Sequence, residues 1–268
     1  KIRVLAFYLP QFHPIPENDK WYGKGFTEWT NVGKAKPLFR GHYQPRVPAD
    51  LGYYDLRVPE TRQAQADMAR EYGVEAFCYW HYWFGNGRRL LERPFNEVLE
   101  SGKPDFPFCL AWANHSWRGI YNGVKTKESL IDQTYGGLSD YERHFYDVLP
   151  AFEDKRYVTV DGKPFFLIFA PAEIPDSREF IDCWQRLAAR NGLTGIHFVA
   201  HTYQPNDIDN FLSMGYDAVN VVRLFEYQRI GISFVQKVLN KVNREVFKHG
   251  FWCQYKDCLL YTSDAADD

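Results

Sequence analysis

The sequence predicts an α/β fold, and within that class a (β/α)8 TIM barrel, C-terminally truncated with about six of its eight strands present. Six short runs of apolar, aromatic and β-branched residues alternate with polar loops and with stretches of helical periodicity. The runs lack a clean alternation of polar and apolar residues, which indicates a parallel sheet covered by helices on its outer side. An open doubly wound sheet is the alternative. It is disfavoured because Pro10 to His13, and not a glycine-rich phosphate loop, follows the first run.

The expected strands follow one another at nearly even spacing. They lie at residues 4–9, 76–83, 106–112, 165–170, 196–201 and 218–222. Because the sixth ends near residue 222, each unit takes about 37 residues, and eight units need roughly 300. The 268-residue chain is therefore expected to end before the barrel closes.

Helical periodicity fills the stretches between these strands. Phe180, Trp184 and Leu187, for example, recur at spacings near four, as one face of a helix requires. The expected helices lie at residues 60–72, 90–99, 141–152, 178–189 and 207–214, with a basic helix at 233–249. Residues 251–255 are a connector or the start of a seventh strand. No repeat or linker divides the chain, so we expect one domain.

The last residues of the chain are predicted to be foreign to the protein. The last 11 residues, Cys258 to Asp268, match the translated reverse complement of a common transposase library adapter, and we interpret them as a sequencing artefact. A natural acidic tail is the alternative. The domain is then 1–257, and the gene is expected to continue beyond Asp257. Because an unclosed barrel leaves two strand edges unpaired, we expect the fragment alone to be inactive and poorly stable.

Composition excludes several classes of function. The net charge of −2 and pI near 6.5 lack the basic footprint of a protein that binds nucleic acid or an anionic membrane. No window reaches the roughly 18 apolar residues of a membrane span, and no signal peptide opens the chain, so we expect a cytoplasmic protein. Without a C-x-x-C pair, the cysteines outside the adapter-like tail are expected to be free thiols, buried where they fall in the apolar runs. They are Cys78, Cys109, Cys183 and Cys253.

The residues that end the strands predict a carbohydrate site. In a barrel the site lies at the carboxyl ends of the strands, and here aromatic rings stand beside hydrogen-bonding groups, which suits a sugar. Each ring taken singly could instead fill the core. His81, His115 and His201 could bind a metal, but no carboxylate accompanies them at a recognisable spacing, so we predict neither metal nor cofactor. The predicted substrate-binding residues here are Tyr8, His13, Trp80, His81, Trp83, Trp112 and Asn114.

A long loop after the first strand, residues 13–58, is expected to form a lid over the site. It supplies Trp21, Glu28 and Trp29, which we predict to contact the substrate. Glu28 is the best candidate in this loop for an acid or an acceptor for a sugar hydroxyl, although a solvated loop glutamate is the alternative. The other scattered carboxylates form no obvious catalytic pair. They are Asp132, Glu173 and Glu226.

Five ordered motifs resemble the WbsX-type proteins, which are described as glycosyltransferases of polysaccharide biosynthesis and as relatives of glycoside hydrolase family 99, the endo-α-mannosidases. The motifs are Phe7 to His13, Gly25 to Trp29 with Asn31, Asp50 to Asp55, Tyr79 to Trp83, and Ala111 to Asn114. The resemblance implies a glycoside-hydrolase-like (β/α)8 barrel over residues 1–257 and a metal-independent site that acts on polysaccharide. It also implies a catalytic pair of glutamates three residues apart after the last strand. Nothing in the sequence matches that motif, so we expect the pair beyond Asp257.

The predicted function is a carbohydrate-active enzyme of this type that acts on glycosidic bonds of a bacterial surface polysaccharide, such as lipopolysaccharide. Two alternatives stay open. One is a glycosyltransferase of O-antigen or capsule biosynthesis, although no nucleotide-phosphate site is visible in the sequence. The other is a non-catalytic glycan-binding barrel. The sugar, its linkage and the stereochemical outcome are not predicted.

Overall fold

The computed structural model describes residues 2–37, 41–118, 129–223 and 234–245. The chain divides into two compact units, Lys1–Lys36 with Tyr43–Asn220, and Pro37–His42 with Val221–Asp268. Within the second unit the helix α8 (Phe234–Glu245) is described, inside the span predicted for the basic helix. The expectations for Glu226, for residues 251–255 and for the adapter-like tail lie outside the described residues.

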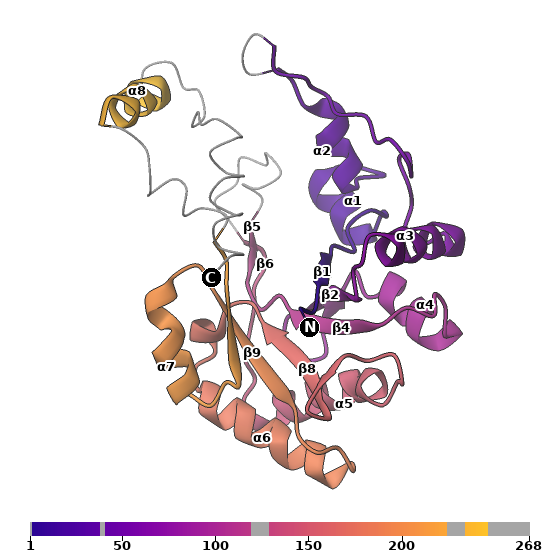
Figure 1. Ribbon diagram of the computed structural model, residues 1–268, viewed down its shortest axis with the longest axis vertical. Helices are drawn as coiled ribbons and strands as arrows, with labels where there is room; N and C mark the ends of the chain where they lie inside the picture. The colour runs from indigo at the N-terminus through magenta and orange to yellow at the C-terminus, as the bar shows by residue number, and fades with distance from the viewer. Residues whose placement is uncertain (1, 38–40, 119–128, 224–233, 246–268) are drawn as a thin grey trace. The chain divides into compact units, whose positions relative to one another are not determined.

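A curled parallel sheet organises the first unit (Figure 1). Its main strands are β1 (Leu5–Tyr8), β2 (Ala76–Trp83), β4 (Phe108–Trp112), β8 (Lys163–Ile168), β9 (His197–Thr202) and β10 (Ala218–Val221). They lie side by side in the order in which they occur along the chain, and the neighbouring pairs β1–β2, β2–β4, β4–β8 and β8–β9 are parallel. A doubly wound sheet would reverse this order at its switch point. The sheet is therefore part of a (β/α)8 barrel with six of its strands, as predicted.

Helices cover the outer side of this sheet (Figure 1). They are α3 (Pro59–Glu71), α4 (Arg93–Ser101), α5 (Leu138–Phe152), α6 (Ser177–Arg190) and α7 (Ile208–Ser213), close to the predicted spans. The largest difference is at α4, which was expected from residue 90. Leu90 instead belongs to β3 (Arg89–Leu90), antiparallel to the end of β2, and Leu91 has a φ of 60° that no helix allows. None of the described helices has both the length and the apolar character needed to cross a membrane.

Alternating faces of the strands separate two kinds of environment. On β2 the Tyr79 ring contacts Phe95 of α4, whereas the Trp80 ring contacts Phe7 of β1 on the inner face of the sheet. Because successive strand residues point to opposite faces, His81 and Trp83 share the outer face with Tyr79. The inner face carries Trp80 and opens at the carboxyl end of the strands.

The outer core is packed around one tryptophan, Trp184 of α6. It is fully buried, and its Nε1–H donates to the carbonyl of Tyr141 on α5 at 3.0 Å. Its ring lies 4.8 Å from Phe166 of β8, which ties both helices to the sheet. Buried aromatic rings of this size supply much of the apolar area on which such a layer depends. Three of the predicted free cysteines, Cys78, Cys109 and Cys183, are confirmed as buried thiols.

The long segment between β1 and α3 is a folded excursion and contains two helices that the sequence analysis did not identify, α1 (Pro16–Tyr22) and α2 (Glu28–Lys34). Thr27 caps α2 by accepting from the backbone N–H of Trp29 at 3.2 Å. The Trp29 ring packs 4.7 Å from Phe12, and its Nε1–H donates to the Tyr54 carbonyl at 2.8 Å. These contacts hold the excursion above the carboxyl end of β1 (Figure 1). Further short strands are β5 (Trp117–Arg118), paired with β6 (Ser129–Ile131), and β7 (Thr159–Val160).

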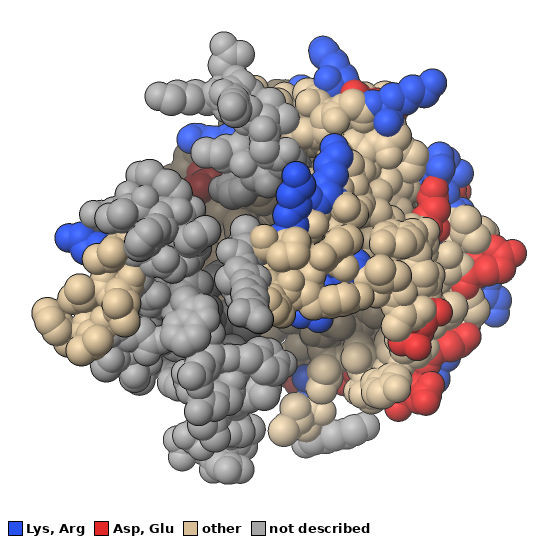
Figure 2. All heavy atoms as spheres, turned by 90° about the horizontal axis from the view of Figure 1, so that it is seen from above, with Lys and Arg blue, Asp and Glu red and all other residues tan. Residues whose placement is uncertain are grey.

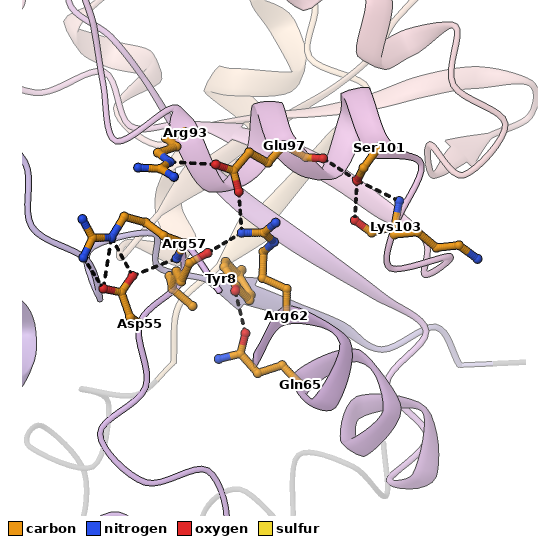
Figure 3. A network of polar contacts seen from close by, with 10 residues as sticks. Tyr8, Asp55, Arg57, Arg62, Gln65, Arg93, Glu97, Ser101 and Lys103 are labelled. Carbon is orange, nitrogen blue, oxygen red and sulfur yellow. Dashed lines mark hydrogen bonds and ion pairs between the residues drawn. The ribbon is translucent and has the colours of Figure 1, made fainter. Parts of the chain in front are cut away.

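A buried arginine joins this excursion to α3 and α4 (Figure 3). The Arg62 side chain on α3 is 4% exposed, donates to the Leu56 carbonyl at 2.6 Å and pairs with Glu97 of α4 at 2.8 Å. Glu97 also accepts from Arg93 at 2.7 Å, and these arginines lower the pKa of its carboxyl. The ion pair of Arg62 and Glu97 therefore holds the excursion, α3 and α4 together.

We expect Arg62→Ala to lower the free energy of unfolding by about 2–4 kcal/mol, because it leaves a buried carbonyl and one carboxylate of the pair without their donor. Glu97 is about one third exposed, so water compensates part of the loss. Urea unfolding followed by circular dichroism measures the change. The matched control is Arg178→Ala, which removes an exposed pair with Asp182 and is expected to cost less than about 0.5 kcal/mol. Equal effects of the two substitutions would contradict this role of Arg62.

Candidate functional site

Aromatic rings from four strands meet on the inner face of the sheet. Phe7 of β1 stacks on Trp80 of β2 with ring centroids 4.7 Å apart. Trp80 meets Phe169, after β8, edge to face at 5.6 Å, and Phe169 stacks on His201 of β9 at 5.1 Å. Phe7 is 46% exposed although it is large and apolar. The rings form a continuous floor at the carboxyl end of the sheet, where a barrel places its site.

His201 has one ring nitrogen bound and the other unbound. The Asn220 side-chain nitrogen on β10 lies 2.9 Å from His201 Nδ1, and an amide nitrogen can only donate, so Nδ1 accepts. Burial lowers the pKa of His201, which favours the neutral ring with its proton on Nε2. Nε2 has no hydrogen-bond partner among the described residues. His201 is therefore an uncharged donor that supports the aromatic floor.

Two cavities share one wall, and Phe169 of this floor lines the larger of them. The smaller, about 310 Å³, is lined by Leu9, Gln11, Tyr22, Glu28, Tyr82, His115, Trp117 and Arg118. The larger, about 630 Å³, is lined by His115, Ser116, Arg118, Phe169, Glu173 and Tyr203. His115 and Arg118, which follow β4, belong to both. This arrangement offers apolar rings beside a few polar groups, the usual character of a site for an organic ligand.

Glu28 is the predicted site residue whose chemistry fits the smaller cavity. It begins α2, and its backbone N–H donates to the carbonyl of Gln11 at 3.2 Å, which holds the helix start against the end of β1. Burial raises the pKa of the Glu28 carboxyl, which accepts a long hydrogen bond from the Asn31 side-chain nitrogen at 3.5 Å. A carboxyl that keeps its proton to higher pH is suited to donate a proton or a hydrogen bond.

Asn114 lies at the end of β4 and is fully buried. Its amide nitrogen donates to the Ala170 carbonyl at 2.8 Å and to the Tyr135 hydroxyl at 3.0 Å. Its oxygen accepts from the Ala170 N–H at 2.8 Å. Its amide groups are thus used within the protein, and the structure gives it the role of fixing the loop after β8, which carries Phe169 and Glu173, against β4.

Four predicted sugar contacts lie on the outer face of the sheet and away from both cavities. Tyr8 is packed against Phe77, and its hydroxyl donates to Gln65 of α3 at 2.6 Å. Trp83 and Trp112 both contact the ring of His144 on α5. His81 lies 2.8 Å from the same histidine through Nε2. In our assignment these residues build the wall of the site, and Phe7 takes the inward place expected for Tyr8.

The remaining predicted residues belong to the excursion after β1. His13 is buried, burial lowers its pKa, and both ring nitrogens lack a hydrogen-bond partner among the described residues. Trp29 packs inside the excursion, and Trp21 meets Trp117, a lining residue of the smaller cavity, at 6.0 Å. Trp21 and Glu28 thus border the site, and their contact with a substrate stays a prediction.

The buried histidine pair, His81 and His144, is the most acid-sensitive feature of the outer wall. Their Nε2 atoms are 2.8 Å apart, so one donates and the other accepts, and the accepting ring must be neutral. Burial lowers the pKa of both rings, and the neighbouring His81 lowers that of His144 further. The unfolded chain therefore binds protons more readily than the folded one below a pH of about 6.5.

We expect the free energy of unfolding to be highest above pH 6.5 and to fall as the pH drops toward 5, by up to about 1.4 kcal/mol per pH unit for each histidine. Urea unfolding at pH 7.5, 6.5 and 5.5 measures it. The variant with phenylalanine at both positions keeps rings of similar size, cannot titrate there, and is expected to lose less stability over the same range. A wild-type stability that is constant from pH 7.5 to 5.5 would contradict the assignment.

Comparison with known proteins identifies the family. A family model described as "Glycosyltransferase WbsX" matches residues 4–265, nearly the whole chain. The chain belongs to the WbsX family. Its curated relatives include "Uncharacterized protein WxcX" from two strains of Xanthomonas campestris pv. campestris, B100 and ATCC 33913. Each is 42% identical to this chain over 217 residues. The match covers 80% of this chain and 30% of either relative, so the chain spans about a third of their length.

Solved structures show the same fold at low sequence identity. The GH99 endo-α-mannosidase from Bacteroides thetaiotaomicron, in complex with BIS-TRIS-propane, gives a TM-score of 0.52 at 14% identity, covering 83% of this chain and 59% of that one. A "Glycoside hydrolase-like protein" gives 0.52 at 14% identity, covering 92% and 69%. The likeness supports the barrel assignment for this WbsX family member and says nothing of its substrate.

Several residues of the candidate site were not among the predicted substrate-binding residues, although the sequence analysis had considered His115 and His201 as metal ligands and Glu173 as a scattered carboxylate. They are Phe7, Gln11, Tyr82, His115, Arg118, Phe169, Glu173, His201 and Tyr203. The alternation of side chains between the two faces of a strand could have identified some of them. Phe7 and Trp80, for example, must share a face if their strands pair in parallel register. Within the described ranges, no three His, Cys, Asp or Glu side chains come together as a metal centre needs.

Proposed function

We propose that the complete protein is a carbohydrate-active enzyme that acts on glycosidic bonds of a bacterial surface polysaccharide, at the carboxyl end of the sheet. The observation that carries this proposal is the pair of adjoining cavities, one with the half-buried carboxyl of Glu28 and the other walled by the rings of Phe169 and Tyr203. Sugars present C–H faces to aromatic rings and hydroxyls to polar groups, so a cavity of this kind suits them.

In this proposal Glu28 is the acid, or the acceptor for a sugar hydroxyl, within the residues at hand. Cleavage of a glycosidic bond proceeds through a cation-like sugar, and a protonated carboxyl assists by giving its proton to the departing oxygen. The raised pKa of Glu28 supports this role. His115, whose pKa is lowered by burial, is neutral and supplies a hydrogen-bonding nitrogen in the wall that both cavities share.

A transferase is the second candidate, because the family model carries the description "Glycosyltransferase WbsX". Its site would hold an activated sugar donor together with an acceptor glycan. Two adjoining cavities suit two sugars as well as they suit one chain that spans both. The shape of the site therefore leaves the choice between hydrolysis and transfer to experiment.

The test uses the complete gene product incubated with α-mannan and other bacterial polysaccharides, with and without nucleotide sugars. Shorter glycans without added donor support a hydrolase, and glycans that grow only with a donor support a transferase. The matched variants are Glu28→Gln and, as a control on the exposed face of α5, Glu142→Gln. Binding without turnover of any glycan would indicate a binding protein, and neither binding nor turnover would overturn the proposal.

A further inference from the structure

Arg118 is a notable member of the site because its charge has no partner among the residues that the structure describes. It is exposed, lines both cavities, and makes no ion pair with another described residue. A guanidinium offers a planar fork of donors that matches a carboxylate or phosphate in two hydrogen bonds. Other arginines of the first unit do form ion pairs. The buried side chains of Arg62 and Arg156, for example, pair with Glu97 and Asp154.

The excursion that borders the smaller cavity is also basic. The whole excursion, residues 9–58, carries seven Lys and Arg against five Asp and Glu, a net charge of +2 in a chain whose net charge is −2. Lys20, Lys24, Lys34 and Lys36 are exposed and form no ion pair with described residues. Lys20 and Lys34 lie in the last turns of α1 and α2, where a positive charge stabilises the helix. Lys24 and Lys36 lie outside the helices and have no such role.

The charges on one face of the molecule are unevenly distributed. Figure 2 shows this face from above, with Lys and Arg side chains spread across its coloured part and most Asp and Glu side chains toward one side. The acids in the site oppose this charge only in part. Glu28 has a raised pKa, which reduces its negative charge, and Glu173 lies in the larger cavity. An anionic ligand therefore meets unpaired positive charge on the excursion and again at Arg118.

We propose that the glycan bound at this site is itself negatively charged, and that Arg118 holds a carboxylate or phosphate group of the sugar chain at the wall between the two cavities. The inference rests on the proposed function and adds the chemical class of its substrate. Lys24 and Lys36 attract the same polymer before it is bound, and their contribution is screened by salt. A glycan is favoured over a nucleic acid because the positive charge leads to cavities walled by rings and is absent from the chain as a whole.

The test compares each anionic polymer with its neutral counterpart, using the complete gene product. The polymers are alginate and polygalacturonate, each with its carboxyl-reduced form, for the carboxylate, and a phosphomannan with its dephosphorylated form for the phosphate. Affinity electrophoresis measures the dissociation constants at 50 and 300 mM salt. At least one anionic polymer is expected to bind about tenfold or more tightly than its neutral form, the factor that one charge-assisted contact supplies.

The variants assign the effect to residues. Arg118→Gln is expected to remove about a tenfold preference for the anionic polymer over its neutral form, and Arg118→Lys to restore part of that preference. The double variant Lys24→Gln with Lys36→Gln is expected to weaken the salt dependence. The matched control is Lys155→Gln, an exposed lysine after α5, and it should change nothing.

The possible failures are distinguishable. Equal binding of all charged and neutral pairs, an Arg118→Gln variant that binds every polymer as the wild type does, or tighter binding of duplex DNA than of any glycan would overturn the inference. Turnover of a neutral polysaccharide without dependence on Arg118 would overturn the inference and leave the proposed enzyme standing. Arg118-dependent binding of an anionic glycan without turnover would support the inference and overturn the proposed enzyme activity.

Discussion

Glu28→Gln is expected to lower kcat/KM on the glycan substrate by about a hundredfold or more, the range observed when a general acid is lost. Glutamine keeps the size of the side chain and its long contact to Asn31 but cannot give up a proton. The backbone N–H that donates to Gln11 is unchanged, so α2 should stay in place. Circular dichroism and the unfolding midpoint check that the variant is folded.

The pH dependence separates the two roles considered for Glu28. Burial raises the pKa of its carboxyl, so a general acid is active at low pH and loses activity as the pH rises through that raised value. The Gln variant should lack this alkaline decline. If Glu28 only accepts a hydrogen bond from a sugar hydroxyl, the loss should be closer to tenfold and the pH profile should keep its shape. Glu28→Gln with the activity of Glu142→Gln would exclude both roles.

Trp184→Ala is expected to cost about 3–5 kcal/mol of unfolding free energy, the largest effect on stability in the first unit. The ring is fully buried and touches rings from α5, α6, β8 and β9. Alanine leaves a cavity among these rings and removes the hydrogen bond to the Tyr141 carbonyl. Since a typical domain has a total stability of 5–15 kcal/mol, such a variant should unfold at much lower urea concentration.

Two further variants show whether packing is the cause. Trp184→Phe fills most of the space and loses the Nε1–H donor, so it should cost about 1–2 kcal/mol. Tyr146→Ala on α5 removes a ring that is 47% exposed and should change stability by about 0.5 kcal/mol or less. If all three variants unfold at the same urea concentration, Trp184 is not the centre of this core.

Much of the fold followed from local patterns. The Phe180, Trp184 and Leu187 spacing predicts α6, because those side chains must share a face to be buried together, and the structure has all three in the core. The helices in the β1–α3 excursion were missed because each has seven residues, about two turns, with too few apolar positions to show a period. Their stability comes from contacts such as Phe12 with Trp29, which link residues distant in sequence.

The candidate site, like the fold, was predicted from the sequence only in part. Sequence alone predicted the class of fold, which the structure confirms. It also led us to expect the site at the strand ends and, from the aromatic content, a sugar as its ligand, and both of these stay predictions. Tertiary structure decided which residues face that site, placing Phe7 and Trp80 inward and Tyr8, His81, Trp83 and Trp112 outward. The physical reason is that both faces of a barrel strand are buried, so polarity does not mark the inner face, and only the register with neighbouring strands does. Only the folded chain could show that Arg118 has no ion-pair partner among the described residues, because the sequence does not reveal which charges come together.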